Sequence, residues 1–249
     1  MTKTVLQLVQ DILVDINGDE VNSITDTVEA EQIANILKSS YEALVSSDTW
    51  PHTRRAIVLN AYSDSTKPNY MTLQDEVKEL CAMNYNCIKA GETRKNYKPL
   101  TYLDTDKFLV KTNARDNTKS NVDVIIDPSG IELLIQNDKR PEYFTSFNDK
   151  DLIFDSYDSA VDSTLQESKF QAQGYIIPSF TVSDSFMPDI PPEAVSYLRE
   201  ETVSRVQLKL REFEDIKAEQ SASTQKRTLS RKNWRVNGGT KYPNYGRKR

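Results

Sequence analysis

The chain has 249 residues, with 32 Lys and Arg against 37 Asp and Glu, which gives a formal net charge of -5 at pH 7. This length fits one large or two small domains, and a hydrophobic share of 37% is enough to build a core. Only two cysteines and one histidine are present, too few for a four-ligand zinc site and in keeping with free thiols in a reducing compartment. The sequence has no run of about 18 apolar residues, so we expect no membrane span. We also expect no signal peptide, because the first 17 residues alternate between polar and apolar.

The chain begins with a predicted pair of helices. Apolar residues recur every three or four positions across residues 4–16, and Asn17 and Gly18 can end that helix. After a short loop, Asp26 or Thr27 can cap a second helix, which runs to about residue 47. Two amphipathic helices joined by a short loop predict a helical hairpin.

The middle of the chain has the period of β-strands. Its clearest signal is the apolar run VDVII, the turn DPSG and the apolar run IELLI, which predict a hairpin with a type I turn. PEYFTSF and DLIFDSY predict a second strand pair. Cys81 and Cys87 lie six residues apart on an alternating segment, so we expect both as small buried residues on the same face of one strand.

A long helix is predicted near the C-terminus, from about residue 192 to 232. Asp189 can cap it, and Pro191 and Pro192 suit its first turn. Its second half loses the apolar stripe, so we expect that half to project from the core or to pack on another molecule. The predicted fold is α+β: a helical bundle (residues 1–50 and 190–232), an inserted antiparallel β-rich domain (51–189) and an extended basic tail (233–249).

The sequence offers no catalytic constellation. There is no phosphate-binding glycine loop and no nucleophile elbow, and His52, beside Pro51, is expected to be a loop residue. We therefore expect no enzyme activity, no cofactor and no bound metal. One alternative stays open, because Asp151, Asp155 and Asp158 could bind a divalent cation, although their spacing is not that of an EF-hand loop.

Charge is divided unevenly along the chain. Residues 226–249 hold nine Lys or Arg and no acidic residue, so the remainder of the chain has a net charge of -14. The same segment contains Trp234, Tyr242 and Tyr245 among Asn, Gly and Pro. Such a segment can bind nucleic acid, dock into a groove of another protein or be inert, and we favour docking because no nucleic-acid-reading motif accompanies it.

Several segments resemble the head-to-tail adaptor proteins of short-tailed bacteriophages, the tail tubular protein A family. The N-terminal run LVQDILVDINGDEVNSI, the second helix ending at Trp50, the run at 140–159 and the ending RKNWRV…YPNYGRKR carry the resemblance, which covers about half of the chain. The loop at 17–22 departs from the family in lacking its proline. The order of several segments, not any single motif, is the evidence.

The resemblance implies a non-catalytic structural virion protein, made in the host cytoplasm, that forms a ring of twelve copies in the neck. The ring would bind beneath the portal protein and receive the tail nozzle protein. Genomic DNA would pass through its central channel without being bound sequence-specifically. The resemblance implies no membrane partner. The alternatives are a nucleic-acid-binding protein that uses the tail, or another phage neck or tail completion protein. The residues expected to dock into the portal are Arg227, Arg231, Lys232, Trp234, Arg235, Tyr242, Tyr245 and Arg247.

Overall fold

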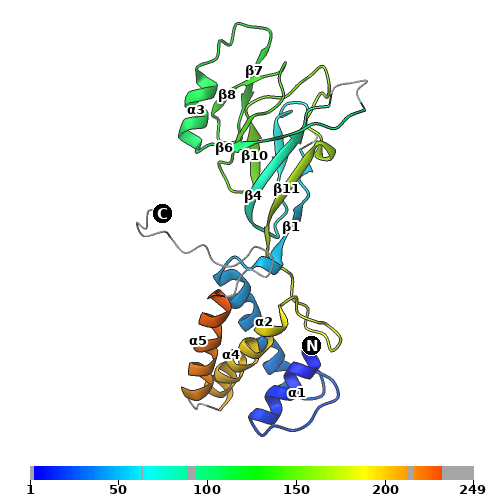
Figure 1. The fold of residues 1–249 in the computed structure, drawn as a ribbon, viewed down its shortest axis with the longest axis vertical. Helices are drawn as coiled ribbons and strands as arrows, with labels where there is room; N and C mark the ends of the chain where they lie inside the picture. Colours follow the sequence, from blue (N-terminus) through cyan, green and yellow to red (C-terminus); the bar gives the residue numbers. More distant parts are fainter. Residues whose placement is uncertain (1–2, 63, 89–92, 212–215, 232–249) are drawn as a thin grey trace, which may run out of the picture. The chain divides into compact units, whose positions relative to one another are not determined.

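A computed structural model describes residues 3–62, 64–88, 93–211 and 216–231. The fold is α+β, with helices at the start, β-sheets in the middle and two further helices near the C-terminus (Figure 1). The contacts between residues divide the chain into two compact units. The helical unit combines the two ends of the chain, up to Thr53 and from Ile177, and the β unit comprises Arg54–Ile176.

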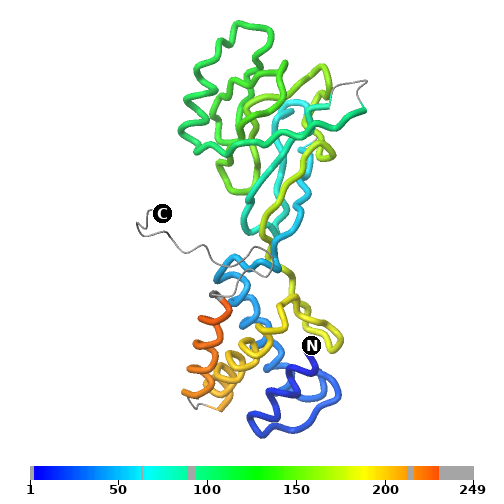
Figure 2. Tube along the Cα trace, viewed as in Figure 1, coloured from blue at the N-terminus to red at the C-terminus, as the bar shows by residue number. Residues whose placement is uncertain are grey.

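In the described part of the helical unit, four α-helices pack around one core. They are α1 (Val5–Asp15), α2 (Val28–Ser47), α4 (Pro192–Leu210) and α5 (Ile216–Arg231). Helix α4 contacts each of the other three, so the first and last parts of the chain lie side by side (Figure 2). The predicted hairpin of α1 and α2 packed with C-terminal helical structure is confirmed.

Short polar side chains set the starts of the first two helices. Thr4 and Gln7 form a reciprocal capping box at α1, and Thr27 accepts a hydrogen bond from the Ala30 N–H at α2. Asp26, the other candidate cap, instead accepts hydrogen bonds from the N–H groups of the two residues at positions 22 and 23. Asp26 therefore shapes the loop before α2, and Thr27 caps the helix.

The predicted long C-terminal helix is wrong, because the structure has two helices in its place. Helix α4 ends at Leu210, and α5 packs back against it. The physical reason is burial: Ala218, Ala222 and Leu229 are small or apolar residues on one face of α5, and all three lie in the core of the helical unit. A continuous helix would have carried that face away from α4. The N-cap also differs from the prediction, since Pro191, not Asp189, occupies it.

Among its described residues, the β unit has three sheets and one α-helix. A four-stranded sheet has the order β1-β11-β4-β5, a five-stranded sheet has the order β2-β3-β10-β9-β6, and β7 pairs with β8. Helix α3 (Thr105–Asn113) contacts β8 and β9. The strands are β1 (Arg54–Ile57), β2 (Asn60–Ala61), β3 (Tyr70–Thr72), β4 (Val77–Asn86), β5 (Tyr97–Pro99), β6 (Thr101–Tyr102), β7 (Val122–Ile126), β8 (Glu132–Gln136), β9 (Tyr143–Thr145), β10 (Asp151–Phe154) and β11 (Phe170–Ile176).

The predicted hairpins are confirmed. Strands β7 and β8 pair across the DPSG turn, which the Gly130 N–H closes on the Asp127 carbonyl at 2.8 Å. Strands β9 and β10 also pair antiparallel. The sheets are not wholly antiparallel, however, because β6 pairs with β9 in parallel. These strands are far apart in the sequence, so no local turn motif predicts their pairing.

The two cysteines do not share a face as expected. The pairing of β4 with β11 shifts register beside Cys81, since Ala82 faces Gln173 while Leu80 faces Gly174. Such a bulge adds one residue and breaks the two-residue alternation of a strand. Cys81 is accordingly exposed and Cys87 half-buried, so the expectation of two buried thiols is wrong.

Candidate functional site

Two of the eight predicted docking residues lie on α5. Arg227 has an exposed side chain, and Arg231 is the last residue of the helix. The other six expected docking residues lie outside the described residues: Lys232, Trp234, Arg235, Tyr242, Tyr245 and Arg247.

The three aspartates considered as cation ligands have separate local partners. Asp151 accepts hydrogen bonds from Thr72 and Asn148, Asp158 accepts one from the Ala160 N–H, and Asp155 is buried in an ion pair. Within the described ranges, no group of three or more His, Cys, Asp or Glu side chains could hold a metal ion.

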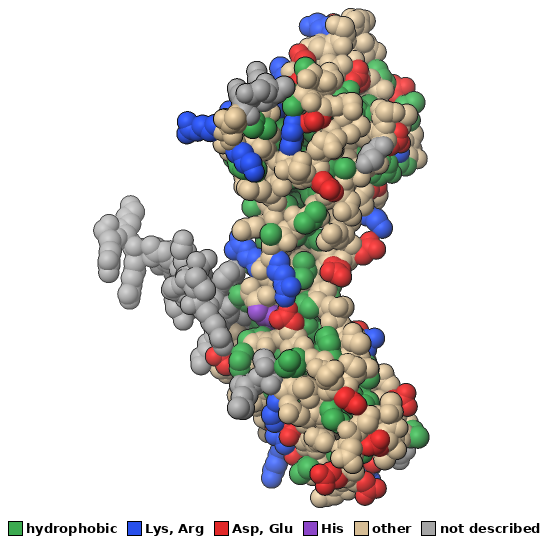
Figure 3. Space-filling model, turned by 90° about the vertical axis from the view of Figure 1, so that its right-hand side faces the viewer, with side chains coloured by type: hydrophobic (Ala, Val, Ile, Leu, Met, Phe, Trp, Pro, Cys, Tyr) green, Lys and Arg blue, Asp and Glu red, His purple; other side chains and the backbone are tan. Residues whose placement is uncertain are grey.

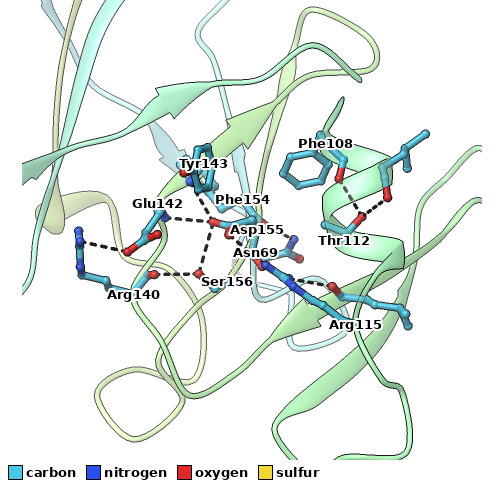
Figure 4. A network of polar contacts seen from close by, with 12 residues as sticks. Asn69, Phe108, Thr112, Arg115, Arg140, Glu142, Tyr143, Phe154, Asp155 and Ser156 are labelled. Atoms are coloured by element: carbon cyan, nitrogen blue, oxygen red, sulfur yellow. Dashed lines mark hydrogen bonds and ion pairs between the residues drawn. The ribbon is translucent and has the colours of Figure 1, made fainter. Parts of the chain in front are cut away.

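A network of hydrogen bonds and an ion pair in the β unit surrounds Asp155 (Figure 4). One carboxylate oxygen accepts hydrogen bonds from the Glu142 and Tyr143 N–H groups at 3.0 and 2.9 Å. The other oxygen accepts from Arg115 Nη2 at 3.0 Å. The Arg115 and Asp155 side chains are only 11% and 6% exposed, so this is a buried ion pair whose partners satisfy each other.

Arg115 joins three segments that are distant in the sequence. It follows α3, and its Nη1 donates to the carbonyl oxygens of Leu134 on β8 and of Asp155 after β10. Ser156 adds a hydrogen bond to the Arg140 carbonyl at 2.8 Å. Because the partners of Arg115 are backbone carbonyls and a buried carboxylate, the pair positions the strand ends around it.

An open hollow of about 400 Å³ adjoins this network. Four cationic side chains line it, together with Gln136, Ser156 and the two carboxylates Glu142 and Asp155; the cations are Lys111, Arg115, Lys139 and Arg140. Both arginines have a carboxylate partner, Asp155 and Glu142 respectively. The hollow therefore has a local excess of two positive charges in an acidic chain.

Each lysine of the hollow lacks a carboxylate partner among the residues that the structure describes. The Lys111 ammonium lies over the Tyr143 ring, 3.9 Å from its centre, which fixes its position by a cation–π contact. Lys139 is exposed beside Arg140. The sequence alone does not reveal this set because its members come from α3 and from the segment after β8, so no short-range spacing connects them.

A second polar cluster lies where β3 meets the turn between β7 and β8. The Tyr70 hydroxyl donates to Asp127 at 2.7 Å, and the Ser129 N–H donates to the other carboxylate oxygen at 2.9 Å. Burial raises the pKa of Asp127, but the hydrogen bonds from Ser129 and Tyr70 outweigh it and leave that pKa below its usual value. Burial and the bond to Asp127 raise the pKa of Tyr70, so its hydroxyl remains a donor.

Comparison with models of known protein families found no match for this chain. A search of curated proteins found no match either. Among the described residues, none of the helices combines the length and the apolar character needed to cross a membrane.

Proposed function

We propose that this protein is a structural component of a virion, a head-to-tail adaptor that forms a ring beneath the portal of a short-tailed bacteriophage. The observation that carries the proposal is the order of family-like segments along the chain, from the N-terminal helices to the basic, aromatic ending. The ring would join the portal protein to the tail nozzle protein and form part of the DNA channel. The proposed activity is binding, without catalysis.

The architecture supports this proposal at the level of the fold class. The resemblance implies a helical bundle that carries a β-rich domain, and the chain has helices from both ends packed together with a β unit between them in the sequence. Such an arrangement offers the surfaces of two compact units. One protein can then contact different partners through different units.

The C-terminal segment would supply the contact with the portal. Its aromatic residues Trp234, Tyr242 and Tyr245 are of the kinds that dominate binding energy when buried in a cleft. Its lysines and arginines would meet acidic walls and favour one orientation. In a ring, many weak contacts act together, so modest affinity per copy gives a durable assembly.

The charge of the chain outside the tail fits a channel that DNA must traverse. That part has a net charge of -14 and would repel phosphate, so DNA could move without sticking. On the face drawn in Figure 3, acidic, basic and apolar side chains are interspersed. A net excess of acid spread in this way gives a general repulsion.

The nucleic-acid-binding alternative rests on the nine basic residues of positions 226–249. Binding by those residues would weaken steeply as salt increases, because phosphate contacts release counterions. Docking by buried aromatic residues would survive moderate salt. A role as another neck or tail completion protein would differ only in the partner bound.

The test is mass photometry of the purified chain mixed with the portal protein encoded in the same genome. A version that ends at Arg231 removes the tail but keeps Leu229, which is buried in the helical core. Two full-length variants separate the mechanisms: one changes Trp234, Tyr242 and Tyr245 to Ala, and the other changes Lys232, Arg235 and Arg247 to Gln.

We expect the full-length chain to add the mass of a ring to the portal, and the version ending at Arg231 to add none. The aromatic variant should lose portal binding at moderate salt, while the basic-to-Gln variant should retain most of it. The adaptor proposal fails if the full-length chain does not bind the portal but shifts the mobility of DNA at low salt. In that case the nucleic-acid alternative predicts that the basic-to-Gln variant loses the DNA shift and the aromatic variant keeps it.

A further inference from the structure

We propose that the hollow beside the Arg115–Asp155 pair is a binding site for a phosphate group. This inference concerns the β unit and is independent of the proposed adaptor role. It rests on four cationic side chains around one hollow of about 400 Å³, only two of which are neutralised by carboxylates. That volume is ample for a phosphate or a nucleoside monophosphate.

The cations approach the hollow from two separate elements. Lys111 comes from α3, Arg115 follows that helix, and Lys139 and Arg140 follow β8. In Figure 4, Arg115 and Arg140 reach toward Asp155 and Glu142 from separate segments. A ligand with oxygens pointing in several directions can meet such a set, whereas two adjacent surface lysines would contact it from one side only.

Both arginines already have partners, so the lysines supply the charge that a ligand would meet. A guanidinium fork can bind a carboxylate or a phosphate with two parallel bonds. Here both Nη atoms of Arg115 are occupied by Leu134 and Asp155, and those of Arg140 contact Cys87 and Glu142. The cations without a carboxylate partner are lysines, which act as point charges and suit a tetrahedral oxyanion.

The site is also held ready for a ligand. The buried pair with Asp155 fixes Arg115, and the ring of Tyr143 lies beneath the Lys111 ammonium at 3.9 Å from its centre. The Tyr143 N–H donates to Asp155, so the same carboxylate orients both supports. Groups positioned before binding lose little freedom when the ligand arrives.

The test compares phosphate binding by the full-length chain and two double variants, using isothermal titration calorimetry at constant ionic strength. The test variant is Lys111→Gln with Lys139→Gln. The control is Lys107→Gln with Lys119→Gln, which removes the same charge from α3 and the loop after it, outside the hollow. All three proteins keep the basic tail, so its contribution is the same in each.

We expect the test variant to bind inorganic phosphate about tenfold more weakly than the wild type, since two charge contacts are lost, while the control matches the wild type. Equal binding by all three proteins, or no binding by the wild type, would overturn the site. Parallel titrations with a deoxynucleoside monophosphate and a short DNA duplex identify the source of the phosphate. If the test variant loses affinity for the DNA duplex as well as for inorganic phosphate, the site contacts a strand backbone. If it loses affinity for the small ligands only, the site takes free phosphate or a nucleotide.

Discussion

At the scale of single residues, the buried pair of Arg115 and Asp155 connects the segment after α3 with β8 and the end of β10. Changing Asp155 to Asn removes the negative charge and leaves the Arg115 guanidinium buried without a counter-charge. We expect the free energy of unfolding to fall by about 3 kcal/mol, as for other broken buried pairs. Urea unfolding followed by tyrosine near-UV circular dichroism measures this loss.

The matched control for that change is Asp75→Asn. Asp75 pairs with Lys150, but its side chain is 86% exposed, so solvent screens the interaction. We expect a change within about 0.5 kcal/mol. Similar effects of the two substitutions would mean that burial of the Asp155 pair contributes nothing.

Asp127 gives the β unit a dependence on pH. Because its pKa is depressed in the folded protein, the ionised form stabilises the fold above its ordinary pKa of 3.8, and this stability is lost as pH falls through the depressed value. The stability difference between wild type and Asp127→Asn should therefore be largest above about pH 5 and shrink below about pH 4. Urea unfolding at pH 6, 5, 4 and 3 tests this, and a constant difference would contradict it.

At the scale of elements, Gly174 permits the close approach of β11 to β4. A Cβ at this position would lie 2.2 Å from the Glu79 carbonyl oxygen and 2.4 Å from Ile57 Cδ1. We expect Gly174→Ala to cost about 3 kcal/mol, because a backbone carbonyl yields less readily than a side chain. Gly130 has open space around it but a φ of +85°, so Gly130→Ala should cost only about 1 kcal/mol. Equal losses in thermal unfolding would refute the steric explanation.

The position of α5 can be tested with two neighbouring substitutions. Ala222 is 1% exposed in the helical core, whereas Ser223 beside it is exposed. We expect Ala222→Glu to destabilise the helical unit by about 3 kcal/mol or more, since an unpaired charge would be buried, and Ser223→Glu to have little effect. Far-UV circular dichroism during urea unfolding measures both. A helix that projected into solvent would tolerate both changes.

The elements that could be predicted from the sequence are those whose signals are local. The periodicity of α1 and α2, the cap at Thr27 and the turn at DPSG each depend on residues within one or two turns of chain. The break after Leu210 was not predictable in this way, because α5 packs through only a few small residues, such as Ala218 and Ala222. The bulge at Cys81 depends on its pairing with β11, a strand far along the chain.

The same distinction applies to the candidate sites. The basic, aromatic composition of the tail is visible in the sequence, so docking residues could be proposed there. The candidate phosphate site requires Lys111 and Lys139 to line the same hollow, which follows from the packing of α3 on β8. Nothing in the spacing of those two lysines along the sequence indicates that they share it.

At the scale of the whole molecule, the β unit is inserted into the sequence of the helical unit at a single place. Strands β1 and β11 pair antiparallel, with Arg54 opposite Tyr175, so the two ends of the insertion are about 5 Å apart. We therefore expect that replacing residues 54–176 with a Gly/Ser linker of about six residues leaves a folded helical unit. Cooperative unfolding with a strong helical signal would support this, and a chain without that signal would contradict it.

The insertion also has a consequence for the order of folding. Helices α1 and α2 are complete early in synthesis, but their core requires α4, which begins only after the whole β unit has been made. If the intervening chain were unstructured, closing that loop would cost about 4 kcal/mol. Pairing of β1 with β11 closes it in advance, so folding of the β unit brings α2 and α4 within reach. The helical unit is then the last part to complete its fold, although its first helix is made before the β unit.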